Sequence, residues 1–167
     1  MYKALILIIS VLMAATACNR NAVTLDYTNA KEEVPRLGNL VFRFSDPLVK
    51  DSLLNNWDST AFIRFEPAIP GRFRWERADE LVFSPSQPLP PATSFKAVLQ
   101  TDILAYSAFN RIEGAEELHF HTPYLRLEDV HPAWVLQDGN TKTPVPQAEL
   151  AFNYAVNPSD LPSKLHI

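Results

Sequence analysis

The fold class can be inferred from residues 71–85, which read GRFRWERADELVFSP. In the first half, Phe73 and Trp75 alternate with charged residues, so the two rings lie on one face of an extended strand and the charges on the other. The second half holds the apolar run Leu81-Val82-Phe83, which ends at Ser84-Pro85. This stretch therefore predicts two short strands, each with a buried face.

Further segments with a period of two lie on both sides of this stretch. They are residues 40–44, 62–65, 94–100 and 118–121. Turn signals separate them about every 8 to 12 residues, a spacing typical of a β-sandwich. We therefore expect an all-β, antiparallel, immunoglobulin-like (Ig-like) sandwich over residues 39–123. Its core should hold Phe73, Trp75, Phe83 and Phe95 together.

A second run of the same kind begins after Thr122-Pro123. It contains residues 125–127, 134–136 and 150–154, with the tight-turn sequence Asp138-Gly139-Asn140 between the last two. A domain of this size is close to the limit of about 40 residues below which folding needs disulfides, metals or partners. Residues 124–167 are therefore expected to be the start of a second, incomplete sandwich.

The N-terminus has the three parts of an export signal. Lys3 precedes an apolar run over residues 4–15, and small residues flank the only cysteine, Cys18. The pattern resembles the bacterial lipobox, which implies a signal peptide over 1–17, a lipid on Cys18 and a tether over 18–38. The chain would then be a lipid-anchored protein of the bacterial cell envelope, facing the periplasm; the alternative is a soluble secreted protein cut after Ala17.

The composition excludes several classes of function. Lys and Arg total 15 against 19 acidic residues, for a net charge of -4, so we expect no nucleic-acid partner. Only 4 glycines accompany 14 prolines, which argues against a glycine-rich phosphate loop. A single cysteine allows no disulfide within the chain.

Two sets of side chains suggest chemistry, but their surroundings do not support it. His119 and His121 share one side of a predicted strand, as metal ligands can, yet they are better explained as polar residues on its exposed face. Ser84, His131 and Asp129 supply the residue types of a hydrolase triad, but no glycine-bounded serine is present. We therefore expect no catalytic residue, no metal, no cofactor and no enzymatic activity.

Aromatic and basic residues alternate over the central strands. The arginines are Arg64, Arg72, Arg74 and Arg77, and the rings beside them are Phe62, Phe65, Phe73 and Trp75. Single-strand nucleic-acid binders use such stripes, but alternation sends the rings inward and leaves the arginines in solvent beside acidic residues. Burial is expected for Trp57, Trp75 and Trp134; an exposed ring would favour glycan binding.

Several motifs of the predicted sandwich occur in a characteristic order. They are FIRFEP (62–67), PGRFRW (70–75), LVFSP (81–85) and LPPATSF (89–95), followed by FHTP (120–123) and FNYAVNP (152–158). This order resembles the first macroglobulin-like domain of bacterial alpha-2-macroglobulins and the start of the second. The resemblance covers essentially the whole mature chain.

The resemblance implies a function as well as a macroglobulin-like fold. The chain would be the N-terminal scaffold and membrane-anchor portion of a protease-trapping endopeptidase inhibitor, with proteases as partners and a penicillin-binding protein as a further one. The family's thioester needs a cysteine followed by Glu-Gln, and Cys18 is the only cysteine, so no thioester is expected here. The alternative is an Ig-like envelope lipoprotein that binds a glycan or a surface protein.

Overall fold

The computed structural model describes residues 21–114, 117–136 and 143–161. These residues are almost entirely strands and loops, with three single-turn 3-10 helices. The strands are β1 (Ala22–Thr28), β2 (Glu32–Glu33), β3 (Leu40–Phe44), β4 (Trp57–Asp58), β5 (Ile63–Glu66), β6 (Gly71–Arg77), β7 (Glu80–Pro85), β8 (Ser94–Leu99), β9 (Arg111–Glu113), β10 (Leu118–His121), β11 (Leu127–Leu136) and β12 (Pro144–Phe152). The 3-10 turns are η1 (Asp51–Leu53), η2 (Thr101–Leu104) and η3 (Pro158–Asp160).

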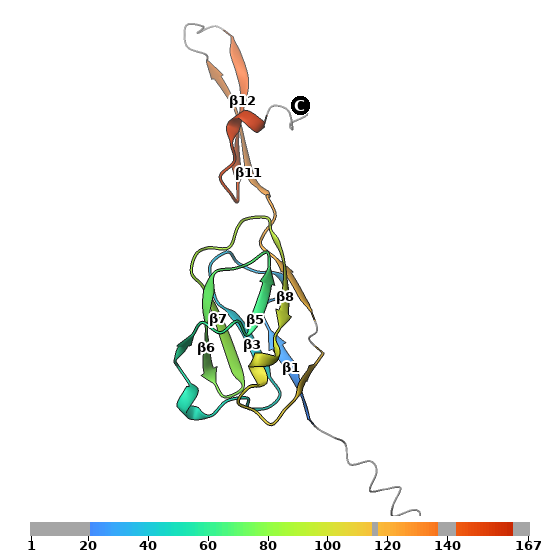
Figure 1. The fold of residues 1–167 in the computed structure, drawn as a ribbon. Coiled ribbons are helices and arrows are strands. Elements are labelled where there is room, and N and C mark those ends of the chain that lie inside the picture. The colour runs from blue at the N-terminus through green and yellow to red at the C-terminus, as the bar shows by residue number, and fades with distance from the viewer. Residues whose placement is uncertain (1–20, 115–116, 137–142, 162–167) are drawn as a thin grey trace, which may run out of the picture.

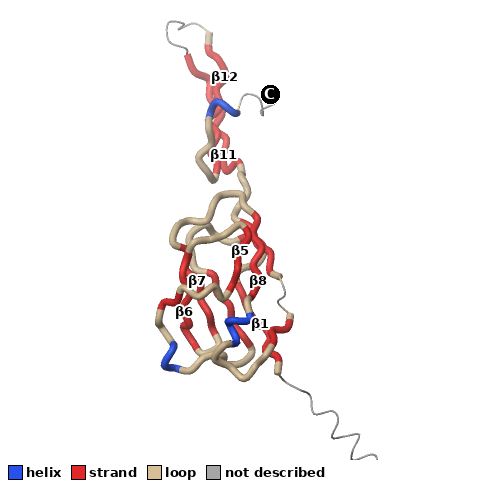
Figure 2. The backbone as a smooth tube through the Cα atoms, viewed as in Figure 1, coloured by secondary structure: helices blue, strands red, loops and turns tan. Residues whose placement is uncertain are grey.

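Strands β1 to β10 form two sheets that pack against each other (Figures 1 and 2). One sheet has the order β4-β6-β7-β3-β1-β9 and the other the order β2-β10-β8-β5. Neighbouring strands are antiparallel except β1 with β9 and β2 with β10, which are parallel. The all-β sandwich predicted from the sequence is therefore confirmed, with two parallel pairs that the prediction did not contain.

The core lies between the two sheets and is rich in aromatic rings. Trp75 and Phe73 on β6, Phe83 on β7 and Phe95 on β8 all belong to one buried cluster, as predicted. Across the two sheets, the ring centroids of Phe65 and Phe83 lie 4.7 Å apart. Because each strand of this core alternates buried and outward residues, the period of two in the sequence correctly identified the inward face.

The first strands lie where the sequence suggested a tether. β1 pairs with both β3 and β9, and Val23 on this strand is completely buried. Val34, which follows β2, donates its backbone N–H to the His121 carbonyl and is also buried. Residues 22–34 are thus part of the sandwich and do not form a tether. Their apolar residues are too sparse to show a periodic pattern, and non-local pairing supplies what the pattern lacks.

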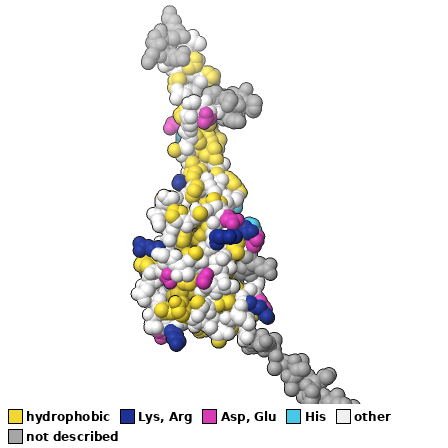
Figure 3. All heavy atoms as spheres, in the orientation of Figure 1, with side chains coloured by type: hydrophobic (Ala, Val, Ile, Leu, Met, Phe, Trp, Pro, Cys, Tyr) yellow, Lys and Arg dark blue, Asp and Glu magenta, His cyan; other side chains and the backbone are white. Residues whose placement is uncertain are grey.

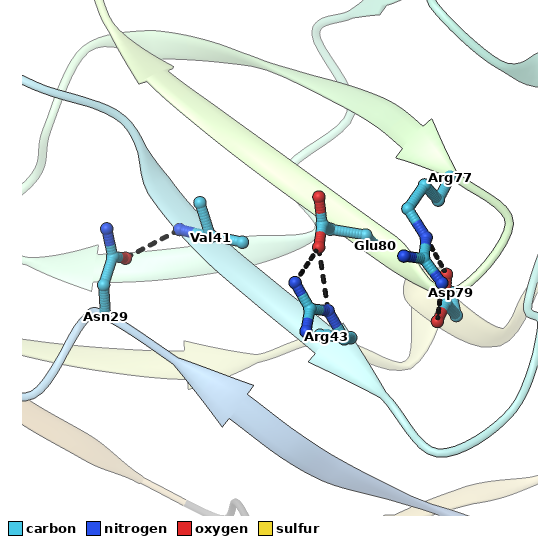
Figure 4. Close-up of polar contacts among 6 residues, drawn as sticks. All are labelled: Asn29, Val41, Arg43, Arg77, Asp79 and Glu80. Atoms are coloured by element: carbon cyan, nitrogen blue, oxygen red, sulfur yellow. Dashed lines mark hydrogen bonds and ion pairs between the residues drawn. The ribbon is translucent and has the colours of Figure 1, made fainter.

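Polar side chains fasten the larger sheet at its surface (Figure 4). Arg43 on β3 donates two hydrogen bonds to Glu80 on β7, at 2.9 and 2.7 Å, and these raise the pKa of the Arg43 guanidinium. Asn29 accepts from the Val41 backbone N–H at 2.8 Å and donates to the Asn39 carbonyl. These contacts join β3 to β7 and to the end of β1.

β11 and β12 form an antiparallel hairpin that makes a sheet of its own. Figure 1 shows this hairpin projecting beyond one end of the sandwich. The predicted turn at residues 138–140 and the C-terminal residues 165–167 lie outside the described residues. The described part of the predicted second sandwich is therefore this single two-stranded sheet.

Candidate functional site

The hairpin has one face made entirely of apolar residues. We call it the apolar hairpin face, and define it as Leu127, Val130, Pro132, Trp134 and Leu136 of β11 with their partners Phe152, Leu150, Ala148, Pro146 and Pro144 of β12. The opposite face carries polar residues such as Asp129, His131 and Glu149. Trp134 is 75% exposed, Leu136 55% and Leu127 50%. Such a contiguous apolar surface is unusual on a folded protein and marks an interaction site.

The exposure of two tryptophans corrects the sequence analysis. Trp75 is buried as predicted, but Trp134 on the hairpin and Trp57 on β4 are exposed. Trp134 lies on a strand with no second sheet over it, and Trp57 lies on the short edge strand β4 of the larger sheet. Alternation shows which way a side chain points, but it does not show whether another layer covers it.

Three prolines of the hairpin determine how another strand could approach it. Pro132, Pro144 and Pro146 lack a backbone N–H, and each occupies a position whose N–H would point away from the partner strand. The outer edges of the hairpin therefore lack donors at these three positions. Addition of another strand at these edges is disfavoured, whereas packing on the apolar hairpin face is unhindered.

A dense set of hydrogen bonds connects the hairpin to the sandwich. Asn153, just after β12, accepts from the Arg126 N–H at 2.8 Å and donates to the Tyr124 carbonyl at 2.8 Å. The Tyr154 hydroxyl donates to the Pro123 carbonyl at 2.8 Å. His121 on β10 stacks on the Tyr124 ring, with centroids 4.4 Å apart. The two ends of the hairpin are thus held together and against the exit of the sandwich.

A cavity of about 500 Å³ lies at this junction. Its lining comes from the loop after β2, from the chain around β11 and β12, and from two prolines. The residues are Pro35, Arg36, Leu37, Pro88, Pro123, Arg126, Asn153 and Tyr154. The sequence analysis missed this cavity because its residues are far apart in the chain, and no local motif joins them.

The paired residues weighed as chemical sites are arranged as follows. His119 lies 3.6 Å from Glu117, whereas His121 contacts the Thr122 carbonyl through its Nδ1. The described residues contain no group of three or more His, Cys, Asp or Glu side chains placed to hold a metal. The pKa of Glu117 is lowered by a hydrogen bond from Lys96, with a smaller contribution from His119.

The three residue types of the candidate triad do not all come together. His131 and Asp129 form an ion pair of 3.0 Å on the exposed hairpin. Ser84 lies on β7, within the larger sheet of the sandwich. The pair on the hairpin is therefore a solvated contact on the polar face of β11.

The predicted arrangement of rings and arginines is confirmed. Phe62, Phe65, Phe73 and Trp75 are buried. Arg64, Arg74 and Arg77 each form an ion pair with the acidic residue two positions later. Figure 3 shows basic and acidic side chains interspersed on this view of the molecule, with no continuous basic stripe.

Cys18, the predicted lipid attachment site, lies outside the described residues, and its modification stays a prediction. Within the ranges that the structure describes, no helix has the length and hydropathy needed to cross a bilayer.

No family model and no curated protein matches this chain. Among solved structures, it is similar to an L,D-transpeptidase from Mycobacterium tuberculosis H37Rv, with 15% identity and a TM-score of 0.39, over 59% of this chain and 39% of the other. L,D-transpeptidase 3 from Mycobacterium tuberculosis, in complex with a faropenem-derived adduct, matches with 16% identity and a TM-score of 0.40, over 62% and 38%. An L,D-transpeptidase from Mycobacterium smegmatis matches with 19% identity and a TM-score of 0.41, over 63% and 41%.

These matches contradict the prediction that the chain has no enzymatic activity, because the matched proteins are enzymes. The prediction rested on the lack of clustered catalytic residues, and that lack does not decide whether a sandwich serves within an enzyme. It is therefore withdrawn. This chain spans about two fifths of the length of the transpeptidases, and at such low identity the match concerns the fold alone.

Proposed function

We propose that this chain is the N-terminal scaffold and membrane-anchor portion of a bacterial alpha-2-macroglobulin, an envelope protein that traps proteases. In this proposal, a lipid on Cys18 attaches the chain to a membrane on the periplasmic side. Residues up to 123 form the first macroglobulin-like domain, and residues from 124 onward begin the second. Proteases are the partners of the whole protein, and a penicillin-binding protein is a further one.

The observation that carries the proposal is the apolar hairpin face, immediately joined to a complete sandwich. An Ig-like sandwich needs two sheets packed about 10 Å apart, and this hairpin offers the inner face of one of them. The junction bonds from Asn153 and Tyr154 fix this face at the end of the first domain. A row of domains connected in this way is suited to holding a large protein away from a membrane.

The proposal is tested on the native protein purified in detergent from the bacterium that expresses it. The protein is incubated with elastase, and the remaining activity is measured on a large protein substrate and on a small peptide. A trapped protease should lose activity on the large substrate and keep it on the small one, because only the large substrate is excluded. Equal activity on both substrates, whether full or lost, overturns the proposal.

The membrane anchor is tested separately by the variant Cys18→Ala. Partitioning of the wild-type protein into the detergent phase should be lost in this variant, since the lipid has no other thiol to occupy. Unchanged partitioning overturns the anchor and favours a soluble secreted protein.

Trp57 supports a second candidate function, an Ig-like envelope lipoprotein that binds a glycan. Its ring is 46% exposed and borders a cavity of about 180 Å³ with Arg72, Ser84 and Ser86. Flat exposed rings stack on sugar faces, but here the Arg74 guanidinium already lies 4.6 Å from the ring centroid. Pull-down on purified peptidoglycan with wild type and Trp57→Ala tests this alternative, which requires binding that the variant loses.

A further inference from the structure

We infer that the junction cavity is a binding site for a carboxylate carried by an extended, apolar peptide. The carboxylate is either the C-terminus of that peptide or an acidic side chain within it. This site is independent of the proposed protease trap, and it is argued from the groups that line the cavity.

Arg36 provides the main attraction for a carboxylate. Its Nε–H donates to the Leu89 carbonyl at 2.7 Å, and the Leu89 N–H donates back to the Arg36 carbonyl. The guanidinium lies 5.4 Å from the centroid of the Tyr154 ring. Its two Nη groups have no acceptor among the described residues, and no described carboxylate pairs with it. The position of the cation is thus fixed while its outer donors stay available, as bidentate binding of a carboxylate requires.

Arg126 adds a second guanidinium to the lining. Its Nη2 lies 3.3 Å from Glu33, and both side chains are largely exposed. Such an exposed pair is weak, so a bound carboxylate can replace or share this contact at little cost. Two guanidiniums therefore line the cavity, and neither is held by a buried acid.

The remaining walls favour an apolar peptide over a sugar. The Tyr154 hydroxyl and both ends of the Asn153 amide already have hydrogen-bond partners in the junction. The other lining residues are Pro35, Leu37, Pro88 and Pro123, of which Leu37 is 72% exposed. A hydroxyl-rich glycan would find few free partners here, whereas proline and tyrosine walls suit an extended proline-containing chain.

The volume is also appropriate for a few residues of peptide. At about 500 Å³ the cavity lies within the range of about 300 to 1,000 Å³ that ligand sites usually have. It also lies where two structural units meet, which is a common place for such sites. The hydrogen bonds of the junction shape it before any ligand arrives.

The experiment measures binding of three peptides to the full 167-residue chain by isothermal titration calorimetry. They are Ac-Pro-Pro-Leu with a free C-terminus, the same peptide as its amide, and Ac-Pro-Pro-Glu-Leu amide. We expect binding of at least one of the two carboxylate peptides and about tenfold weaker binding of the first amide, because one charge-assisted pair is lost. The first and third peptides distinguish a C-terminal carboxylate from a side-chain one.

Matched variants locate the site. Arg36→Gln should weaken binding of the carboxylate peptide about tenfold or more, and Arg126→Gln less, while the control Arg64→Gln should leave it unchanged, since Arg64 pairs with Glu66 on β5. Because Arg36 also holds Leu89, Leu37→Glu gives a second probe at an exposed residue, and its added carboxylate should weaken binding about threefold or more. Equal binding of acid and amide, binding unaffected by Arg36→Gln and Leu37→Glu, or no binding of either carboxylate peptide overturns the inference.

Discussion

The sandwich and the hairpin are built from the same kind of strand but differ in what covers them. In the sandwich, Phe73 and Trp75 on β6 face a second sheet and are buried. In the hairpin, Val130 and Trp134 alternate with polar residues in a similar way, and both are exposed. Hydrophobic patterning therefore specifies a face that can be buried, while burial itself depends on a second layer. The hairpin is such a face without its layer in the described residues.

The largest expected effect comes from shortening the chain at either end. Removing residues 1–28 deletes β1, which lies between β3 and β9, and should abolish cooperative unfolding of the sandwich. Removing residues 124–167 deletes the hairpin and should lower the free energy of unfolding by less than about 2 kcal/mol, because only exposed junction contacts are lost. Urea melts followed by circular dichroism measure both effects. A cooperative melt without β1 would restore the tether that the sequence suggested.

A pair of tryptophan variants sharpens the same comparison at single residues. Trp75→Ala should cost about 3 to 5 kcal/mol, since the ring is buried against Phe44 and Phe62. Trp134→Ala should stay within about 0.5 kcal/mol, since the ring is exposed. Urea denaturation of the full chain, again by circular dichroism, gives both values. A large loss in Trp134→Ala would mean that the apolar hairpin face is covered in solution, as a second copy of the chain would do.

The smallest expected effect concerns the edge of the smaller sheet and its pH dependence. Glu117 has a pKa below the ordinary value of 4.5 because Lys96 donates a hydrogen bond to its carboxylate. Its contribution to stability is therefore complete above pH 4.5 and is lost as the pH falls through the lower folded value. The melting temperature of Glu117→Gln should lie slightly below that of wild type at neutral pH and meet it in acid. A difference that persists in acid contradicts this origin.

The sequence predicted the middle of the sandwich well because its strands show local alternation. Residues such as Phe73 and Phe83 reveal their inward direction through their immediate neighbours. Val23 and Val34 do not, and their burial depends on strands some ninety residues away, roughly the separation of Ala22 from Arg111. The junction cavity was missed for the same reason, since Arg36 meets Tyr154 only after the whole sandwich has formed. Exposed Trp57 shows the opposite error, a large ring whose burial was assumed from its apolar neighbours.

The two parallel strand pairs have a consequence for the order in which the protein folds. β1 pairs with β9 and β2 with β10, so the beginning of the sandwich can complete its ladder only when its end has been made. Because loop closure over such a separation costs entropy before it gains contacts, this step should be slow. During synthesis, the β3, β6 and β7 meander can assemble while β1 waits unpaired on its outer side. If the chain is exported, it can therefore remain loosely folded until nearly the whole first sandwich has crossed the membrane.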